Sequence, residues 1–269
     1  MPTALETPGL TVRTVTATRY VTPLREGGSL PGLMEADDDG LYVVKYTAAG
    51  QGPKALVAEL LGGELGRALG LLVPEIVLAD VDPALGRAEP DPEIQDLLIR
   101  SAGVNLGLDF LPGALPFDPA AGERPGAEPP DPGLAADVVW FDALITNVDR
   151  TARNVNLLEW HHRLWLIDHG AALYIHHTWR EPEEHARRRF ERIADHVLLP
   201  YAGSILEADA RLAPRIDRDL LASLADAIPS AWLDEDAAGQ RRSYVDYLAR
   251  RLEPPRMFVE EAERARRPA

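Results

Sequence analysis

Seven prolines fall within residues 112–132, in a stretch otherwise rich in Gly, Ala and Asp. Proline has no backbone N–H to donate, and its ring clashes with the preceding turn of a helix, so this stretch can form neither a helix nor a central strand. The prolines are Pro112, Pro116, Pro119, Pro125, Pro129, Pro130 and Pro132. We therefore expect residues 113–133 to connect two structural parts, residues 1–112 and residues 134–269.

The first part is predicted to be mainly β-structure with one long helix. β-Branched and apolar runs predict strands at residues 11–21, 33–36, 41–46 and 76–81, and an extended segment at residues 106–111. The acidic turn at residues 37–40 joins the second and third strands as a hairpin. Over residues 53–69, apolar side chains recur at the helix period, and Gly70 ends the helix. Residues 94–100 fit either a short helix or a strand.

The second part is predicted to be mainly helical. Apolar positions on one face predict a helix over residues 134–146, which leads directly into a polar loop at residues 147–154. A β-hairpin with strands at residues 155–160 and 163–167 follows, and His161 and His162 form its turn. Further helices are expected near residues 183–196, 203–212, 217–227 and 238–252. The fold class is therefore α+β.

Three polar residues around this hairpin carry a possible chemistry. Asp149 and Asn154 lie five residues apart in the loop, and Asp168 ends the next apolar strand. Phosphoryl transfer needs a carboxylate to orient the attacking hydroxyl and accept its proton, and it needs hard oxygen ligands that hold Mg²⁺ against the phosphates. Asp149 suits the first task, and Asn154 with Asp168 suits the second. The same residue types also form turns, but the order of all three favours a phosphate or metal site.

The chain resembles the HipA-like kinase family over about residues 21–170. The most specific match is Asn147-x-Asp149-Arg150-x-x-x-Asn154, followed by Asp168 and preceded by a strand lysine, Lys45. The resemblance implies a two-lobed, protein-kinase-like fold. Residues 1–112 would form a β-rich N-lobe with the nucleotide contacts, and residues 134–269 a helical C-lobe with the catalytic loop. It also implies an ATP- and Mg²⁺-dependent kinase acting on Ser or Thr of a protein.

The resemblance also implies roles for individual residues. The expected catalytic residues are Asp149, Lys45 and Arg150, the metal ligands are Asn154 and Asp168, and the nucleotide contacts are Gly27, Gly28, Ser29, Lys45, Glu59, Phe110 and Leu111. Five residues at about 100° each place Glu59 and Glu64 about 140° apart on the helix, so both cannot face Lys45. The resemblance implies that Glu59 is its partner. Arg150 either meets a phosphate or pairs with a carboxylate, and the sequence leaves both open.

Composition argues against several other classes of partner. The chain has 28 basic and 43 acidic side chains and a net charge of −15, so its overall field repels nucleic acid. It has no cysteine, and it has neither a membrane-helix pattern nor a leader pattern, so we expect a cytoplasmic protein without a membrane partner. The pairs His161-His162 and His176-His177 are not expected to bind zinc, because adjacent residues of an extended segment point to opposite faces.

Several alternatives to a protein kinase remain open at this level. Asn147, Thr151 and His169 depart from the residues usual at these positions. His169, together with a Gly-rich turn that is not a G-x-G-x-x-G loop, motivates a pseudokinase that binds nucleotide without turnover. A small-molecule kinase and a nucleotidyltransferase would use the same metal ligands. The arginines at residues 187–189, and those of the tail from Arg250-Arg251 to Arg266-Arg267, could contact an acidic substrate. Glutamates interspersed nearby instead favour a solvated helical face for both groups.

Overall fold

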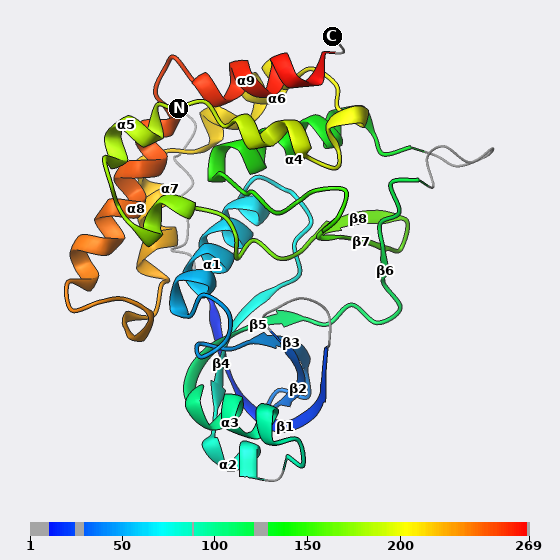
Figure 1. Cartoon of the computed structure of the whole chain (residues 1–269), viewed down its shortest axis with the longest axis vertical. Coiled ribbons are helices and arrows are strands. Elements are labelled where there is room, and N and C mark those ends of the chain that lie inside the picture. The colour runs from blue at the N-terminus through cyan, green and yellow to red at the C-terminus, as the bar shows by residue number, and fades with distance from the viewer. Residues whose placement is uncertain (1–10, 25–29, 88, 121–128, 268–269) are drawn as a thin grey trace, which may run out of the picture.

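The computed structural model describes residues 11–24, 30–87, 89–120 and 129–267. It has a β-barrel at one end and a helical region at the other, with one long helix, α1, between them (Figure 1). The mixed α+β character matches the prediction. Among the described residues, none of the helices combines the length and apolar character that crossing a membrane requires.

Five strands close the barrel in the order β1-β2-β3-β5-β4. They are β1 (Arg13–Pro23), β2 (Gly32–Ala36), β3 (Leu41–Lys45), β4 (Ile76–Val81) and β5 (Gly103–Asp109). Pairing is antiparallel except between β1 and β4, where Arg13 lies opposite Val77 in a parallel ladder. The four predicted strands and the extended segment are therefore confirmed, but the closure of the barrel was not predicted.

Two short helices, α2 (Pro83–Arg87) and α3 (Pro92–Arg100), cover one end of the barrel (Figure 1). α3 settles the ambiguous segment as a helix. Pro92 occupies its first turn, and the Asp91 side chain accepts a hydrogen bond from the Glu93 N–H at 3.0 Å. Both features are typical of a helix N-terminus. α2 was not predicted.

Strand β3 separates two hydrophobic cores. Tyr42 and Val44 point into the barrel core, whereas Val43 packs against the core that α1 (Pro53–Ala68) shares with the helical region. Successive residues of a strand point to opposite faces, so Lys45 lies on the same face as Val43. The alternation therefore directs the lysine away from the barrel interior and towards α1.

Helix α4 (Pro132–Ile145) is the centre of the helical region. It begins where the Asp131 side chain accepts a hydrogen bond from the Leu134 N–H at 2.8 Å. Its neighbours are α6 (Ile205–Leu212), α8 (Ala237–Leu252) and α9 (Met257–Arg266), and α7 (Arg218–Asp226) packs against α8. Apart from α9, which was not predicted, these helices match the expected ranges.

The helix predicted over residues 183–196 is wrong. The segment forms a short helix, α5 (Pro182–Ala186), and then the 3-10 helix η3 (Glu191–Asp195). Ala186, Phe190 and Ile193 are buried at spacings of four and three, which imitates a helical face. The backbone of Phe190, with φ −113° and ψ 79°, leaves the helical region, because this stretch follows the surfaces it packs against, including α9.

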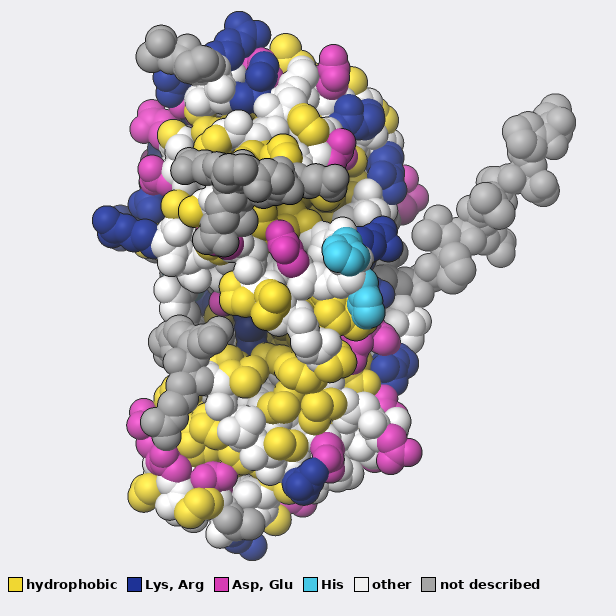
Figure 2. Space-filling view, turned by 90° about the vertical axis from the view of Figure 1, so that its right-hand side faces the viewer, with side chains coloured by type: hydrophobic (Ala, Val, Ile, Leu, Met, Phe, Trp, Pro, Cys, Tyr) yellow, Lys and Arg dark blue, Asp and Glu magenta, His cyan; other side chains and the backbone are white. Residues whose placement is uncertain are grey.

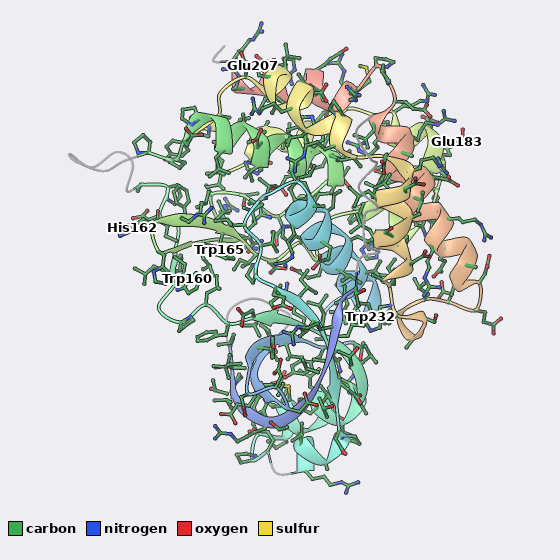
Figure 3. All side chains as sticks on the ribbon, turned by 180° about the vertical axis from the view of Figure 1, so that it is seen from behind. Trp160, His162, Trp165, Glu183, Glu207 and Trp232 are labelled. Atoms are coloured by element: carbon green, nitrogen blue, oxygen red, sulfur yellow. The ribbon has the colours of Figure 1, made fainter. Side chains whose placement is uncertain are left out.

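The predicted hairpin is present as β7 (Leu157–Trp160) and β8 (Arg163–Leu166), and the short edge strand β6 (Leu115–Pro116) completes its sheet. His161 and His162 have φ of 49° and 58°, and positive φ at both central residues is what a tight two-residue hairpin turn requires. Figure 3 shows Trp160, His162 and Trp165 projecting from this hairpin. The proline-rich stretch therefore contributes an edge strand, a position that tolerates proline.

Side chains of the helical region fasten it to the barrel and to α1. The Trp232 indole donates a hydrogen bond to the Val104 carbonyl at the start of β5, at 2.8 Å, and Figure 3 shows Trp232 where the two regions meet. Arg215 donates to the carbonyls of Leu69 and Ala68, at 2.8 and 3.0 Å, at the end of α1. On the face shown in Figure 2, hydrophobic side chains gather over the barrel, whereas basic and acidic side chains are mixed with one another over the helical region.

Candidate functional site

Lys45 joins three elements at one point. Its Nζ donates hydrogen bonds to Glu59 Oε2 of α1 at 2.6 Å and to Asp168 Oδ1, just after β8, at 2.7 Å. The Glu59 side chain is fully buried and that of Lys45 is 12% exposed, whereas that of Asp168 is 42% exposed. The predicted Lys45–Glu59 pair is therefore present. Glu64 instead pairs with Arg67, with 3.4 Å between Glu64 Oε1 and Arg67 Nε.

The charges of this group stabilise one another. Burial alone would lower the pKa of Lys45, but the charges of Glu59 and Asp168 outweigh it and hold that pKa above its usual value. Burial would likewise raise the pKa of Glu59, but the charge of Lys45 and the neighbouring His169 hold it well below its usual range. Both groups are therefore charged at neutral pH and form a salt bridge.

His169 lies on the other side of the Glu59 carboxylate. Its Nδ1 is 3.5 Å from Glu59 Oε1, and both atoms are buried without a hydrogen-bond partner among the described residues. Gly62 makes room for this ring, because a Cβ at that position would lie 2.9 Å from the His169 Cβ. A small shift would let Nδ1–H donate to Oε1, so the geometry makes His169 a second support for Glu59.

The buried carboxylate of Asp142 anchors the loop that carries Asp149. Asp142, near the end of α4, accepts hydrogen bonds from Arg150 Nε at 2.6 Å and from Asn147 Nδ2 at 3.0 Å. His196 Nε2 lies 2.8 Å from the same carboxylate. Burial would raise the pKa of Asp142, but Arg150 and His196 hold it well below the usual range. A charged network therefore fixes the start of the loop.

This network corrects the assignment of Arg150 as a catalytic residue. Its side chain is fully buried and also donates to the carbonyls of Asn156 and, at 3.1 Å, Ile167. A guanidinium enclosed in this way cannot meet a phosphate. Of the two alternatives left open by the sequence, the structure gives the pairing with a carboxylate, that of Asp142.

Asp149 and Asn154 face each other across the loop. Asn154 Nδ2 donates to Asp149 Oδ2 at 2.7 Å, and the Asp149 N–H donates to Asn147 Oδ1 at 3.1 Å. Burial raises the pKa of Asp149, and the nearby charge of Asp168 raises it further against the lowering effect of Asn154. Asp149 and Asp168 are thus close enough to interact, which places the loop beside the Lys45 group.

Two oxygens at this junction are available to a cation. Within the described part of the chain, Asn154 Oδ1 and Asp168 Oδ2 accept no hydrogen bond. An amide and a carboxylate oxygen are ligands that Mg²⁺ takes together with phosphate oxygens and water. The donor set therefore fits a magnesium ion that is held partly by a bound nucleotide.

The other residues predicted to contact nucleotide fall into two groups, one outside the described residues and one at the end of β5. Gly27, Gly28 and Ser29 lie outside the described residues. Phe110 and Leu111 follow β5, where the two regions meet, but the Phe110 N–H already donates to the Leu41 carbonyl at 2.9 Å. The Leu111 N–H donates to no other described residue. Of these two backbone donors, Leu111 is the one free to contact a base.

Sequence reasoning missed the buried residues that support the loop and Glu59. Asp142, His196 and His169 are all buried polar residues of the site. The sequence does indicate a special role for Asp142, because this carboxylate lies inside the apolar run of α4, where an unpaired charge would be costly. It gives no such indication for His196, since its contact with Asp142 joins residues 54 positions apart.

A family model described as HipA-like kinase matches residues 18–254, which is most of the chain. The chain belongs to the HipA-like kinase family. The resemblance seen in the sequence is therefore confirmed, and this HipA-like kinase is an enzyme of the phosphotransferase class. A search of curated proteins gave no match.

Solved kinase structures resemble this HipA-like kinase in fold. The Helicobacter pylori proinflammatory kinase CtkA aligns with a TM-score of 0.55 and 15% identity, covering 94% of this chain and 98% of CtkA. Two structures of the Golgi casein kinase, one with Mn/ADP bound, align with TM-scores of 0.45 and 0.43 and 13% identity, each covering 90% of this chain and 73% of the other. Of these, CtkA exceeds a TM-score of 0.5, and at this identity it supports the fold alone.

Proposed function

We propose that this HipA-like kinase transfers the γ-phosphoryl group of ATP, bound with Mg²⁺, to a Ser or Thr hydroxyl of a protein. The observation that carries the proposal is the double contact of Lys45 Nζ with Glu59 and Asp168, at 2.6 and 2.7 Å. It gathers a strand, a helix and the segment after β8 at one charged point, beside the loop of Asp149. Family membership alone would leave the reacting residues unassigned.

The contacts support a division of labour among these residues. Lys45, held by Glu59, would bind the nucleotide phosphates, and Asp168 and Asn154 Oδ1 would hold the metal. Bound Mg²⁺ neutralises charge on the transferring group. Asp149 orients the acceptor hydroxyl, whose oxygen forms a bond to the γ-phosphorus as the bond to the β–γ bridging oxygen breaks. Asp149 accepts the hydroxyl proton, and ADP leaves.

The nucleotide would lie between two lobes. In this proposal residues 1–112 form the N-lobe, residues 113–133 the connector and residues 134–269 the C-lobe. The Leu111 N–H, free among the described residues, would donate to the adenine at the end of β5. Trp232 joins the lobes at the opposite end of β5, through its 2.8 Å hydrogen bond to Val104.

Isotope transfer separates this function from its rivals. The full-length protein is incubated with Mg²⁺ and a mixture of Ser- and Thr-containing peptides, once with ATP labelled at the γ phosphorus and once at the α phosphorus. Asp149→Asn and Asp168→Asn remove the proposed base and metal ligand with little change of volume. Asp219→Asn, in the first turn of α7, is the matched control.

A kinase transfers the γ label, loses at least 100-fold in rate in both site variants and keeps its rate in the control. Transfer of the α label instead identifies a nucleotidyltransferase. ATP binding without transfer of either label, to peptide, to small alcohols or to the protein itself, identifies a pseudokinase and contradicts the proposal.

A further inference from the structure

The catalytic loop has a second, outward side that opens into a cavity. The cavity is about 350 Å³ and is lined by Thr151, Ala152, Arg153, Arg192 and Asp195. Three of these residues lie between Asp149 and Asn154 in the sequence, so the cavity adjoins the proposed base. The other two belong to η3, which packs near α4 and α9.

This side of the loop is held in place by hydrogen bonds. The Thr151 N–H donates to the Asn154 carbonyl at 2.9 Å, and the Asn154 N–H donates to Thr151 Oγ1 at 3.3 Å, which closes a tight turn around residues 152 and 153. The Val197 N–H donates to the Arg150 carbonyl at 3.1 Å and ties the loop to the segment after η3. Arg153 therefore projects from the same fixed turn that presents Asp149.

The two arginines of the cavity have free donors. Within the described ranges, neither Arg153 nor Arg192 donates a side-chain hydrogen bond, and the one ion pair of Arg192, with Asp195, is long at 3.6 Å. Nearby arginines are occupied: Arg188 donates to Glu184 at 2.6 Å and Arg189 to Glu261 at 3.3 Å. Arg153 and Arg192 thus stand out from the paired arginines around them.

The charge of these two arginines favours an anionic partner. The chain has a net charge of −15, and Asp149 and Asp168 are acidic as well, so an anionic acceptor would be repelled from most approaches to the base. Two guanidinium groups against one carboxylate, that of Asp195, leave the cavity lining with a net positive charge. Guanidinium groups bind carboxylate and phosphate oxygens in a two-pronged geometry, which a point charge cannot provide.

We propose, on the basis of the kinase function above, that this cavity is an acceptor subsite for an acidic protein segment. Arg153 and Arg192 bind an anionic side chain that neighbours the target Ser or Thr, and so bring its hydroxyl to Asp149. The anion is the carboxylate of Asp or Glu, or the phosphate of an already phosphorylated residue. The two arginines are thus specificity determinants, and they take no part in the chemical step.

The test uses the full-length protein with three degenerate peptide pools. Each pool has a central Ser or Thr, flanked by Asp and Glu, by phosphoserine, or by Lys and Arg. Arg153→Glu and Arg192→Glu reverse the charges of the cavity, and Arg188→Glu, an exposed arginine outside it, is the matched control. The measurements are kcat/KM for each pool, the KM for ATP and the rate of ATP hydrolysis.

The acidic or phosphoserine pool is expected to be preferred at least tenfold over the basic pool, and whichever is better identifies the anion. Both cavity variants should lose at least tenfold in kcat/KM for that pool and gain on the basic pool, with an unchanged KM for ATP. Equal use of all pools, failure to use any while ATP hydrolysis continues, or an equal loss in Arg188→Glu overturns the subsite alone. Loss of γ-phosphoryl transfer even to water contradicts the kinase function as well.

Discussion

At the scale of single residues, the two carboxylates that pair with Lys45 differ in their exposure to solvent. Glu59 is fully enclosed, whereas the Asp168 side chain is 42% exposed and can be solvated. Removing the lysine charge therefore leaves one carboxylate buried without a counter-ion. Removal of one partner from a buried pair is costly, even where the pair itself adds little stability.

We accordingly expect Lys45→Met to lower the free energy of unfolding by about 3 kcal/mol or more. Adding Glu59→Gln to that variant removes the orphaned charge and should restore at least half of the loss, while phosphotransfer stays abolished. Urea unfolding of the single and double variants measures the first effect, and γ-label transfer the second. Equal stability of the two variants would show that Glu59 is not charged in the folded protein.

The Lys45–Glu59 pair and the Arg150 network mark the limits of prediction at this scale. Helix periodicity shows that Glu59 and Glu64 cannot both face Lys45, and the family resemblance then selects Glu59. The partner of Arg150 could not be chosen, because α4 carries two aspartates, Asp137 and Asp142, and only the packing buries Asp142 completely. The same arginine therefore remained compatible with a phosphate until its surroundings were known.

At the scale of elements, α8 supports the end of α4, from which the loop of Asp149 starts. Arg251 is buried, and its guanidinium donates to the carbonyls of Leu144 and Ala143, both at 2.7 Å, and of Ala186 at 3.2 Å. The last carbonyls of a helix have no partner within the helix, and a cation there also meets the negative end of its dipole. The sequence interpretation of this arginine as part of a solvated face was wrong.

The neighbouring arginine supplies a control for a test of that support. Arg250 is partly exposed and pairs with Glu253 at 2.7 Å. We expect Arg251→Met to destabilise the protein by about 2–4 kcal/mol, because it leaves buried carbonyls without donors. Arg250→Met should cost less than about 1 kcal/mol, the usual range for a surface ion pair. Thermal or urea unfolding compares the two, and similar losses would contradict the capping role.

A buried histidine of the 3-10 helix η2 (Tyr174–His177) should make the free energy of unfolding depend on pH. His176 is buried, its Nδ1 lies 3.2 Å from the Tyr244 hydroxyl, and Lys54 Nζ donates to its carbonyl at 2.8 Å. Burial, together with the charges of His177 and Lys54, lowers the pKa of His176 from 6.5 to about 3. The unfolded chain therefore binds a proton between these values that the folded chain does not.

Because the unfolded state binds more protons there, stability should fall as the pH drops below about 6.5, with a limit of about 1.4 kcal/mol per pH unit for one group. His176→Gln keeps a polar side chain but cannot titrate. Between pH 6.5 and 5, the wild type should lose roughly 1.5 kcal/mol more than this variant. Urea unfolding at a series of pH values measures the difference, and parallel curves would show that His176 does not contribute.

Elements were predictable where local pattern decides them. The strands and the helices α1, α4, α6, α7 and α8 follow from periodicity and from turn residues. Residues 183–196 failed because a buried spacing of four and three is also satisfied by a bent segment whose path is set by its neighbours. α9 begins after Pro254-Pro255 in a charged tail, and its buried face is narrow, with Phe258, Val259 and Ala262.

At the scale of the whole molecule, the sequence predicted a β-rich part and a helical part but not how the strands close. The parallel pairing of β1 with β4 joins segments separated by two strands and α1, and no local signal encodes such a contact. The closure matters for the site. It fixes β3 and β5 side by side, with Lys45 opposite Leu106, at the edge that meets α1.

The candidate site lies between the barrel and the helical region, so a ligand bound there should contact both and stabilise the folded state. A ligand that binds only the folded state stabilises it by about 2.7 kcal/mol at 100 times its dissociation constant. Mg²⁺ with ATP should therefore raise the Tm, and a chelator should reverse the metal-dependent share. Free of metal, Asp168 remains paired with Lys45 and repels the triphosphate, so ATP with a chelator should stabilise far less than ATP with Mg²⁺.

Asp168→Asn distinguishes the metal contribution from nucleotide binding itself. The variant keeps the side-chain volume but removes the charge that would hold Mg²⁺, so the Tm rise with ATP should become nearly independent of the metal. Asp219→Asn, in α7, should respond like the wild type. Differential scanning fluorimetry over a series of ATP and Mg²⁺ concentrations gives both responses. A metal-dependent rise that persists in Asp168→Asn would mean that the ion is held elsewhere, and the assignment of Asp168 as its ligand would fail.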